Sequence, residues 1–421
     1  MAPAVALDLT RLFVSILRGR PRGIERVDLI FAEAALRHAG RPLYGIIAYP
    51  WGPRLLPRQT VARLVSAVRR VWAEDRPIDD DPVFRQTRRW LLGFGTPPAR
   101  ASRAVGLPAD IAKVASTTGF RRGRDIASLP AGSVYLNVGQ VGFAVDRATG
   151  WLADRPDVKV VSFLHDLLPL RAPEWFKASS DRYFARVLER MLDRSQVVVL
   201  ATEVLRRQLQ DHCRQTGRVP PPIIVQPLAP VPALAYRGGF DPDLASAPYL
   251  MICGTIESRK NHLLPLLLWR DALMAGRPMP KLLVAGGRGW GASEAWRLLD
   301  RSDTLRSHVI EVAGLSSPAL MHLMAHARGL LAPSFSEGFG LPVVEALTLN
   351  VPVLASDIPV YRETAAGRAE LIDPLDGPAW AQAIDRLAWR RPGPERCQAG
   401  DFAPASPEDI ARLLDRLCEQ A

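Results

Sequence analysis

The sequence predicts an α/β protein with two domains, each built around a parallel sheet. Its 421 residues exceed what one ordinary core supports and fit two domains of roughly 200 residues each. In both halves, apolar runs of strand length alternate with helical apolar patterns, which is typical of parallel sheets covered by helices. A stretch rich in proline and glycine, 220–248, divides the halves and indicates a hinge. We therefore expect domains at 1–235 and 236–400, and a last helix within 401–421.

In the first half, strand-length runs and helical patterns follow one another along the chain. The expected strands cover 4–12, 42–49, 133–142, 158–168 and 196–201, and the expected helices cover 24–36 and 181–192. Another helix is expected to begin at Thr202, and a short strand at 223–226 lies inside the hinge. The run 158–168 is apolar almost throughout, as expected of a strand that is buried on both faces of a sheet.

The second half repeats this alternation after the hinge. Its expected strands cover 249–255, 281–286, 309–313, 329–332, 352–356 and 370–373. A series of strands alternating with helices predicts a Rossmann-like domain. The last helix is expected at 406–418.

The composition is that of a soluble globular protein, with 48% hydrophobic and 23% charged residues. No apolar run approaches the ~20 residues that span a bilayer. The first strand contains Asp8 and Arg11, which a secretory signal would lack. The four cysteines are scattered singly, at positions 213, 253, 397 and 418, so we expect neither a zinc site nor a redox motif. A reducing cytoplasm fits this cysteine usage best.

The net charge is positive, with 54 Lys and Arg against 43 Asp and Glu, or +11. Much of it lies at 52–125, which holds 15 basic and 7 acidic residues. A basic face can bind nucleic acid or anionic lipid. No nucleic-acid-binding motif accompanies it, so we expect no nucleic-acid partner. The helical pattern at 60–94 leaves two interpretations open: a helix resting on an anionic membrane, or a core-facing helix with a solvated basic side.

The most informative stretch is 334–347, Ser-Phe-Ser-Glu-Gly-Phe-Gly-Leu-Pro-Val-Val-Glu-Ala-Leu. It follows an apolar strand, contains two glycines that allow close approach of a ligand, and has Pro342 where a helix would start. A helix N-terminus placed after such a loop is a ready anion site. Glu337 and Glu345 flank the loop, separated by seven residues.

A second pattern lies just after the first strand of the C-terminal half. Arg259 and Lys260 stand next to each other where that strand gives way to a helix. An arginine can chelate two phosphate oxygens and a lysine supplies a compact charge, so the pair suits a pyrophosphate.

In the N-terminal half, His165 and Asp166 fall at the carboxyl end of the run 158–168. Open α/β sheets bind their ligands at this end of their strands. Gly23 lies where the first strand passes into the following helix.

These motifs, above all Glu337 and Glu345 with Gly-Phe-Gly and Pro between them, resemble those of retaining glycosyltransferases of GT-B fold. The chain is similar to the family 4 type (glycosyltransferase group 1), which builds bacterial exopolysaccharides, capsules and lipopolysaccharide. The resemblance covers most of the C-terminal half and, more loosely, parts of the N-terminal half. It implies two Rossmann-like domains facing a central cleft, with the C-terminal helix crossing back to the first domain.

The resemblance also implies roles for individual residues. Arg259 and Lys260 would bind the donor diphosphate, and Glu345 the ribose hydroxyls. His165 would approach the donor sugar, and Glu337 would meet it from the other domain. The remaining positions carried over are the loop residues Gly338, Phe339, Gly340 and Leu341 on the donor side, with Gly23 and Asp166 facing the cleft from the acceptor side.

The implied activity is transfer of a hexose, with GDP-mannose the first candidate donor and UDP-glucose the next. The acceptor would be a glycan or lipid-linked oligosaccharide bound by the N-terminal domain. The nucleotide sugar is a substrate, and neither a separate cofactor nor a metal is expected. The expected location is the cytoplasm, with peripheral contact on the inner face of the plasma membrane left open.

Three other functions compete with glycosyl transfer as an interpretation of the sequence. A nicotinamide oxidoreductase would need a glycine fingerprint on a first βα turn. The one loose match, Gly287, Gly289 and Ala292, follows a second strand, and Glu311 lies inside the next apolar run. A nucleotide-sugar 2-epimerase of GT-B fold and a basic membrane-bound scaffold are the other two. The acidic triplet 79–81 resembles the metal motif of another glycosyltransferase class, but its Pro-flanked setting predicts a solvated loop.

Overall fold

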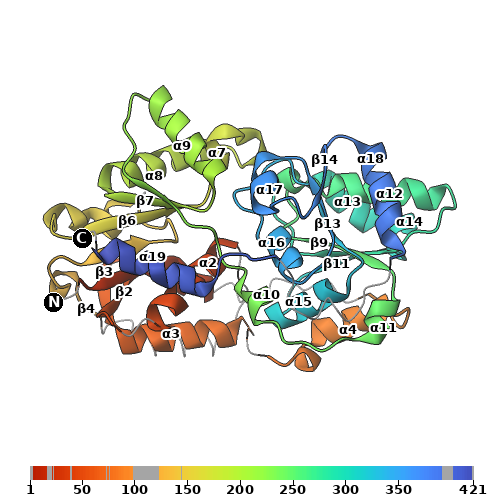
Figure 1. Cartoon of the computed structure of the whole chain (residues 1–421), viewed down its shortest axis with the longest axis horizontal. Coiled ribbons are helices and arrows are strands. Elements are labelled where there is room, and N and C mark those ends of the chain that lie inside the picture. The colour runs from red at the N-terminus through yellow and green to blue at the C-terminus, as the bar shows by residue number, and fades with distance from the viewer. Residues whose placement is uncertain are drawn as a thin grey trace.

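The computed structural model describes residues 3–16, 21, 23–37, 40–72, 74, 76–97, 123–143, 145–390 and 402–419. Two α/β domains lie next to each other, and each is organised around one sheet (Figure 1). The predicted fold class is therefore confirmed.

The N-terminal sheet has eight strands in the order β4-β3-β2-β1-β5-β6-β7-β8. All neighbours pair in parallel except β3, which is antiparallel to both β2 and β4. The strands are β1 Val5–Asp8, β2 Leu43–Tyr49, β3 Gly52–Pro57, β4 Arg124–Asp125, β5 Val134–Asn137, β6 Lys159–Leu164, β7 Val197–Leu200 and β8 Ile223–Val225.

The C-terminal sheet has six parallel strands in the order β11-β10-β9-β12-β13-β14. They are β9 Tyr249–Cys253, β10 Lys281–Ala285, β11 Val309–Val312, β12 Leu330–Ala332, β13 Val353–Ser356 and β14 Glu370–Ile372. All six match strands that the sequence predicted.

Helices cover both faces of each sheet, so side chains that alternate along a strand enter two different cores. In β6, Val161 and Phe163 join one buried cluster, and Val160 and Leu164 join the other. The longer helices of the N-terminal half are α2 Gly23–Arg37, α3 Arg58–Val71, α4 Pro82–Leu91, α8 Ser180–Arg194 and α9 Glu203–Gln215. Those that follow β9 are α12 Leu263–Met274, α13 Ser293–Arg301, α15 Ser317–His326, α16 Leu341–Thr348, α18 Gly377–Ala388 and α19 Pro407–Glu419. The short helices are α1 Thr10–Ser15, α6 Asp146–Thr149, α7 Leu168–Arg171, α10 Val231–Ala235, α11 Pro242–Ser246, α14 Asp303–Arg306 and α17 Pro359–Thr364.

The last helix, α19, returns from the C-terminal domain and packs against α2 of the N-terminal domain (Figure 1). Its Leu413 and Leu417 are fully buried in the N-terminal core. Arg41 pairs with Asp415 at 3.3 Å, which ties the helix to the domain surface. The predicted crossing back is confirmed.

Helix α4 belongs to the N-terminal half of the sequence but packs on the C-terminal domain, near α11 and α15 (Figure 1). Phe84, Trp90 and Leu91 are buried in the same cluster as Tyr249 and Met251 of β9. Helix α3 instead buries its apolar face in the N-terminal core. The apolar sides of both helices therefore face protein, which confirms the core-facing interpretation for the described part of the basic segment; residues 98–122 lie outside it.

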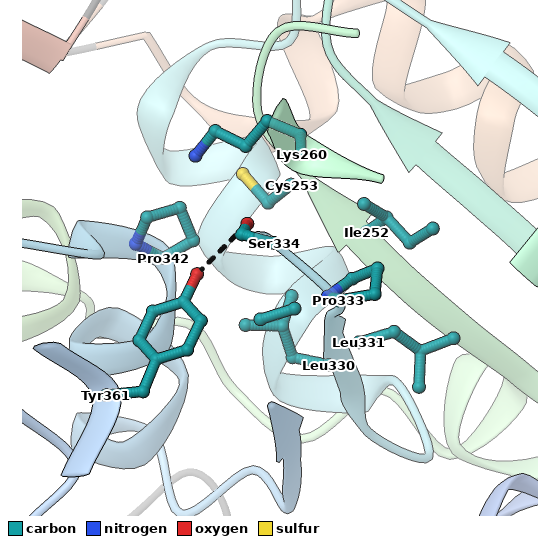
Figure 2. Close-up of a pocket in the computed structure, with 10 residues that line it drawn as sticks. Ile252, Cys253, Lys260, Leu330, Leu331, Pro333, Ser334, Pro342 and Tyr361 are labelled. Atoms are coloured by element: carbon teal, nitrogen blue, oxygen red, sulfur yellow. Dashed lines mark hydrogen bonds between the residues drawn. The ribbon is translucent and has the colours of Figure 1, made fainter. Parts of the chain in front are cut away.

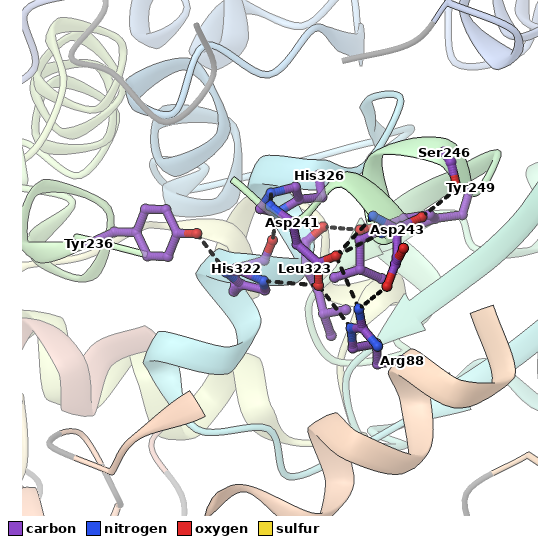
Figure 3. A network of polar contacts seen from close by, with 10 residues as sticks. Arg88, Tyr236, Asp241, Asp243, Ser246, Tyr249, His322, Leu323 and His326 are labelled. Carbon is purple, nitrogen blue, oxygen red and sulfur yellow. Dashed lines mark hydrogen bonds and ion pairs between the residues drawn. The ribbon is translucent and has the colours of Figure 1, made fainter. Parts of the chain in front are cut away.

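A polar network holds α4 in place (Figure 3). The Arg88 guanidinium donates to both carboxylate oxygens of Asp241, at 2.8 and 3.1 Å, and to Asp243 at 2.8 Å. His326 Nε2 accepts the Asp241 amide at 2.8 Å, and His322 Nδ1 bonds to the hydroxyl of Tyr236 at 2.7 Å. A planar guanidinium that meets a carboxylate with two hydrogen bonds fixes orientation as well as distance.

The run 60–94 consists of α3, a 3₁₀ turn at Ile78–Asp80 and α4, with the break at the Pro-flanked acidic triplet that the sequence predicted. One local prediction was wrong in detail. Asp81 of the acidic triplet is buried: its carboxylate accepts the amides of Val83 and Phe84, and that of Ser316 at 2.8 Å in the other domain. Asp79 and Asp80 are exposed, as predicted.

The predicted hinge contains β8, α10 and α11. The strand β8 ends the N-terminal sheet, whereas α10 contacts α15 and α16 of the C-terminal domain. The chain thus changes domain between Val225 and Val231. Among the described residues, no helix has the length and apolarity needed to cross a bilayer.

We expect Phe84→Ala to reduce the free energy of unfolding by about 3 to 5 kcal/mol, because it leaves a cavity where α4 meets the C-terminal core. Phe94→Ala is the matched control, since Phe94 is 65% exposed and such changes cost within about 0.5 kcal/mol. Urea unfolding followed by tryptophan fluorescence measures both. Equal stabilities of the two variants would contradict the docking of α4.

Candidate active site

The predicted site residues follow the carboxyl ends of strands in both sheets. Arg259 and Lys260 lie in a 3₁₀ turn between β9 and α12, and Glu337 lies between β12 and α16. His165 and Asp166 directly follow β6 of the other domain. The structure brings these segments together, as the position of ligand sites in open α/β sheets leads one to expect.

Glu337 is the centre of the site. Its Oε2 accepts a hydrogen bond from Arg259 Nη1 at 2.9 Å, and its Oε1 pairs with the Lys260 ammonium. Ser334 Oγ donates to Oε1 at 2.9 Å, and the Tyr361 hydroxyl donates to the same oxygen at 3.4 Å. Both carboxylate oxygens of this buried side chain are therefore satisfied by charged and hydroxyl donors.

The charge state of Glu337 follows from these contacts. Burial alone raises its pKa, but the charges and hydrogen bonds of Lys260 and Arg259 outweigh burial and lower the pKa to about 2. Glu337 is thus permanently ionised at neutral pH. On the other side of Arg259, Nε donates to Glu257 at 3.1 Å, so this guanidinium joins two carboxylates.

The protein interior next to Lys260 and Ser334 is closely packed. The side chains of Cys253, Lys260, Pro342 and Tyr361 surround a cavity of about 10 Å³ (Figure 2), which holds no more than a single water molecule. The Tyr361 hydroxyl donates to Ser334 Oγ at 3.3 Å within it.

Helix α16 begins where the sequence predicted, with Pro342 in its first turn. Gly340 is its N-cap at φ +84°, and a Cβ there would lie 2.5 Å from the Tyr361 ring. The backbone conformation and the lack of space therefore both require glycine. Phe339 points its side chain into the N-terminal core cluster, where the partly buried Leu341 also packs.

Gly338 lies where the two domains approach each other closely. A Cβ at this position would lie 2.8 Å from the His165 carbonyl oxygen and 3.1 Å from the Asp166 Cβ. Any other residue would push the two loops apart. The sequence predicted both segments, and the structure shows that they touch.

His165 is buried at this contact. Its Nε2 lies 2.7 Å from the Val138 carbonyl oxygen, which fixes the tautomer that carries the proton on Nε2. Burial lowers the pKa of His165 to about 3, so the ring is neutral at pH 7. Burial raises the pKa of Asp166, and the positive charge of Arg259 partly offsets this rise. The Asp166 carboxylate accepts a hydrogen bond from the Leu168 amide at 3.0 Å.

Glu345 lies apart from the Glu337 cluster. It is buried on α16, and Arg26 of α2 lies 3.4 Å from its Oε1. Sequence analysis missed Arg26, although it stands three residues after Gly23, which begins α2. Helical periodicity identified only the apolar face of this helix. It gave no signal for Arg26, which contacts the C-terminal domain.

Further contacts join the domains on the side of α7 and α9. The rings of Trp175 and Phe335 stack at 5.2 Å with 8° between their planes, and Trp290 Nε1 donates to the Trp175 carbonyl at 2.7 Å. The Glu363 carboxylate accepts the Glu203 and Val204 amides at the N-terminus of α9, at 2.6 and 2.9 Å. None of these partners was predicted from the sequence.

The loop after β10 is packed differently from a dinucleotide fingerprint. A Cβ on Gly289 would lie 2.6 Å from the Glu257 side chain, so this glycine serves the packing of two loops. Glu311 is paired with Arg288, whose guanidinium also binds Asp300. Within the described part of the chain, no group of three or more His, Cys, Asp or Glu side chains could hold a metal ion.

Comparison with known proteins agrees with this geometry. Residues 244–399 match the family of glycosyl transferases group 1. The serotype-specific mannosyltransferase WbdA of Escherichia coli is 27% identical over 222 residues, which cover 49% of this chain and 27% of WbdA. The O-antigen chain mannosyltransferase B of Escherichia coli is 27% identical over 243 residues, covering 55% of this chain and 63% of that protein. The matches therefore span less than two thirds of either relative.

Among solved structures, sucrose-phosphate synthase from Thermosynechococcus elongatus superimposes with a TM-score of 0.57 at 18% identity. The alignment covers 99% of this chain and 98% of that one. At this identity the likeness concerns the fold, which is the GT-B arrangement of two parallel-sheet domains. Residues 244–399 therefore belong to the glycosyl transferases group 1 family, within a chain of GT-B fold.

Proposed function

We propose that the chain transfers a hexosyl group from a nucleotide sugar to a glycan acceptor, with retention of anomeric configuration. The observation that carries this proposal is the convergence of Arg259 and Lys260 on Glu337 beside the start of α16, within a group 1 domain. Two cations at a strand-to-helix turn suit a diphosphate.

Both cations pair with Glu337. The donor diphosphate takes over part of these contacts, and the first turn of α16 adds amides that lack intrahelical partners. Glu345 accepts the ribose hydroxyls. No separate cofactor is assigned, because Arg259 and Lys260 supply the positive charge that stabilises the leaving diphosphate.

In the transfer step, the bond between the anomeric carbon and the diphosphate oxygen breaks, and a bond to the acceptor oxygen forms on the same face. The acceptor proton passes to an oxygen of the departing diphosphate. Glu337 orients the sugar and stabilises the oxocarbenium-like state. Its oxygens already receive four donors and its pKa is about 2, which favours this role over that of a covalent nucleophile.

GDP-mannose is the first candidate donor, because WbdA and the O-antigen chain mannosyltransferase B are mannosyltransferases; UDP-glucose is the second. The acceptor is a growing, lipid-linked polysaccharide bound on the N-terminal side of the cleft. A nucleotide-sugar 2-epimerase of the same fold is the alternative activity.

The test offers GDP-mannose and UDP-glucose separately, with and without a lipid-linked oligosaccharide acceptor, and follows the products by mass spectrometry and NMR. We expect mannose to be transferred with an unchanged anomeric configuration. Release of a C2-epimerised sugar without acceptor would identify the epimerase, and an inverted linkage would contradict retention.

The two glutamates should differ kinetically. We expect Glu345→Gln to raise the KM for the donor and to weaken nucleoside diphosphate binding, because Glu345 contacts the ribose. Glu337→Gln should mainly lower kcat, because Glu337 meets the transferred hexose, which a nucleoside diphosphate lacks. Steady-state kinetics and calorimetry separate the two effects. A Glu337→Gln enzyme whose only defect is nucleotide affinity would show that the assignments are reversed.

We also propose that the outer face of α4 contacts anionic membrane while its apolar face stays in the C-terminal core. Arg85 and Arg89 line an open hollow of about 430 Å³ together with Phe94, which is exposed. Two arginines around an exposed aromatic ring suit an interface of anionic headgroups and acyl chains.

Liposome co-sedimentation tests this contact. Binding should require acidic phospholipid and fall with salt, because surface charges are screened within ~10 Å at 0.1 M. Arg85→Ala/Arg89→Ala should weaken binding about 30-fold, at about 1 kcal/mol per residue. Arg301→Ala/Arg306→Ala is the matched control, since it removes the same charge from α13 and α14 of the C-terminal domain. Equal binding to neutral vesicles would overturn the proposal.

A further inference from the structure

Arg26 lies at a polar junction between the two domains. Its Nη1 contacts Glu345 Oε1 at 3.4 Å, and its Nη2 donates to Ser317 Oγ at 3.2 Å. Ser317 in turn donates to Glu74 Oε1 at 2.7 Å. One guanidinium thus lies between two carboxylates and a hydroxyl group.

The partners of Arg26 come from different domains. Arg26 lies on α2 of the N-terminal domain, and Glu74 follows α3 in the same half of the chain. Glu345 and Ser317 stand on α16 and α15 of the C-terminal domain. A rigid movement that separates the domains must therefore break the contacts of Arg26 with Glu345 and Ser317. These contacts exist only in the closed arrangement.

Glu345 has little else to stabilise its charge. Its side chain is 3% exposed, and burial raises its pKa. The charged or titratable groups facing it are Arg26 from α2, Glu74 from the segment after α3, and Cys253 from β9. Arg26 lowers the pKa of Glu345 and Glu74 raises it. Burial raises the pKa of the Cys253 thiol to about 12, so Cys253 stays neutral. Arg26 is the single cation among these three groups.

We propose that Arg26 is a positioning residue that keeps the buried Glu345 carboxylate ionised and aimed at the nucleotide site only while the domains are closed. This inference rests on the proposed role of Glu345 in holding the ribose. A charged acceptor makes hydrogen bonds about twice as strong as a neutral one. Nucleotide affinity then depends on closure, although Arg26 lies on the domain opposite the group 1 match.

Calorimetry with GDP and with UDP between about pH 5.5 and 8.5 tests the proposal. For Arg26→Ala we expect affinity to fall by about tenfold or more at pH 7, and further as the pH falls. The sign follows from linkage: without the cation the pKa of Glu345 rises further, so the ionised form is kept at high pH and lost on acidification. The nucleotide phosphate itself titrates with a pKa of about 6, so the pH profile of each variant is compared with that of the wild type to remove this contribution.

Four further variants make the test specific. Arg26→Lys should restore most of the affinity and the wild-type pH profile, whereas Arg26→Gln, which keeps a donor for Ser317 without the charge, should not. Arg26→Ala/Glu345→Gln should bind weakly but with the wild-type pH profile, because the titrating group is gone. Arg41→Ala is the control. It removes an equally buried arginine from a different carboxylate, Asp415 of α19, at 3.3 Å, and should bind the nucleotide as the wild type does.

Different failures have different meanings. A wild-type protein that binds neither nucleotide contradicts the proposed function, and this inference with it. A wild-type protein that binds, while Arg26→Ala and Arg26→Gln keep its affinity and pH profile, overturns the role of Arg26 alone. Circular dichroism and melting temperature confirm folding of each variant, and Arg26→Gln decides if Arg26→Ala does not fold.

Discussion

The site depends on one interaction, the placement of the Glu337 carboxylate between Arg259 and Lys260. Buried charges are costly unless they are paired and hydrogen-bonded. Here two cations face the carboxylates of Glu337 and Glu257, so these four groups have no net charge when all are ionised. This balance stabilises the contact between the turn after β9 and the loop before α16. In the proposed reaction a donor diphosphate competes with Glu337, so some of its binding energy is spent on loosening this cluster.

The remaining geometry brings the N-terminal domain to this cluster. Gly338 lets the loop after β6 approach, and Arg26 and Trp175 reach across at other points of the boundary. Helix α4 acts in a different way, because it carries part of the N-terminal sequence onto the C-terminal core and is fixed there by Arg88. Any opening between the domains must therefore bend the chain between β8 and α10. We infer that α4 moves with the C-terminal domain.

Much of the fold and the C-terminal half of the site could be predicted from sequence, because those signals are local. A strand, a glycine loop, Pro342 and two glutamates occur within one short stretch, and Arg259 lies beside Lys260. What could not be predicted is non-local. Apolar spacing shows that α4 buries a face but not in which domain. Likewise, Asp81 looks like part of a solvated triplet, because the Ser316 amide it accepts comes from a distant part of the chain. Arg26 is polar on a helix whose periodicity marks only apolar positions.

The two glutamates of the central motif illustrate this limit and give the site its asymmetry. In sequence they form a matched pair, yet the structure lowers the pKa of Glu337 and raises that of Glu345. The cations of Glu337 come from its own domain, so its charge is independent of closure. The cation of Glu345 comes from α2 of the other domain, so its charge depends on closure. Environments that drive two titratable groups apart mark different tasks. With the roles proposed for the two glutamates, the sugar end of the site is preorganised within one domain, whereas the ribose end is completed only when both domains meet.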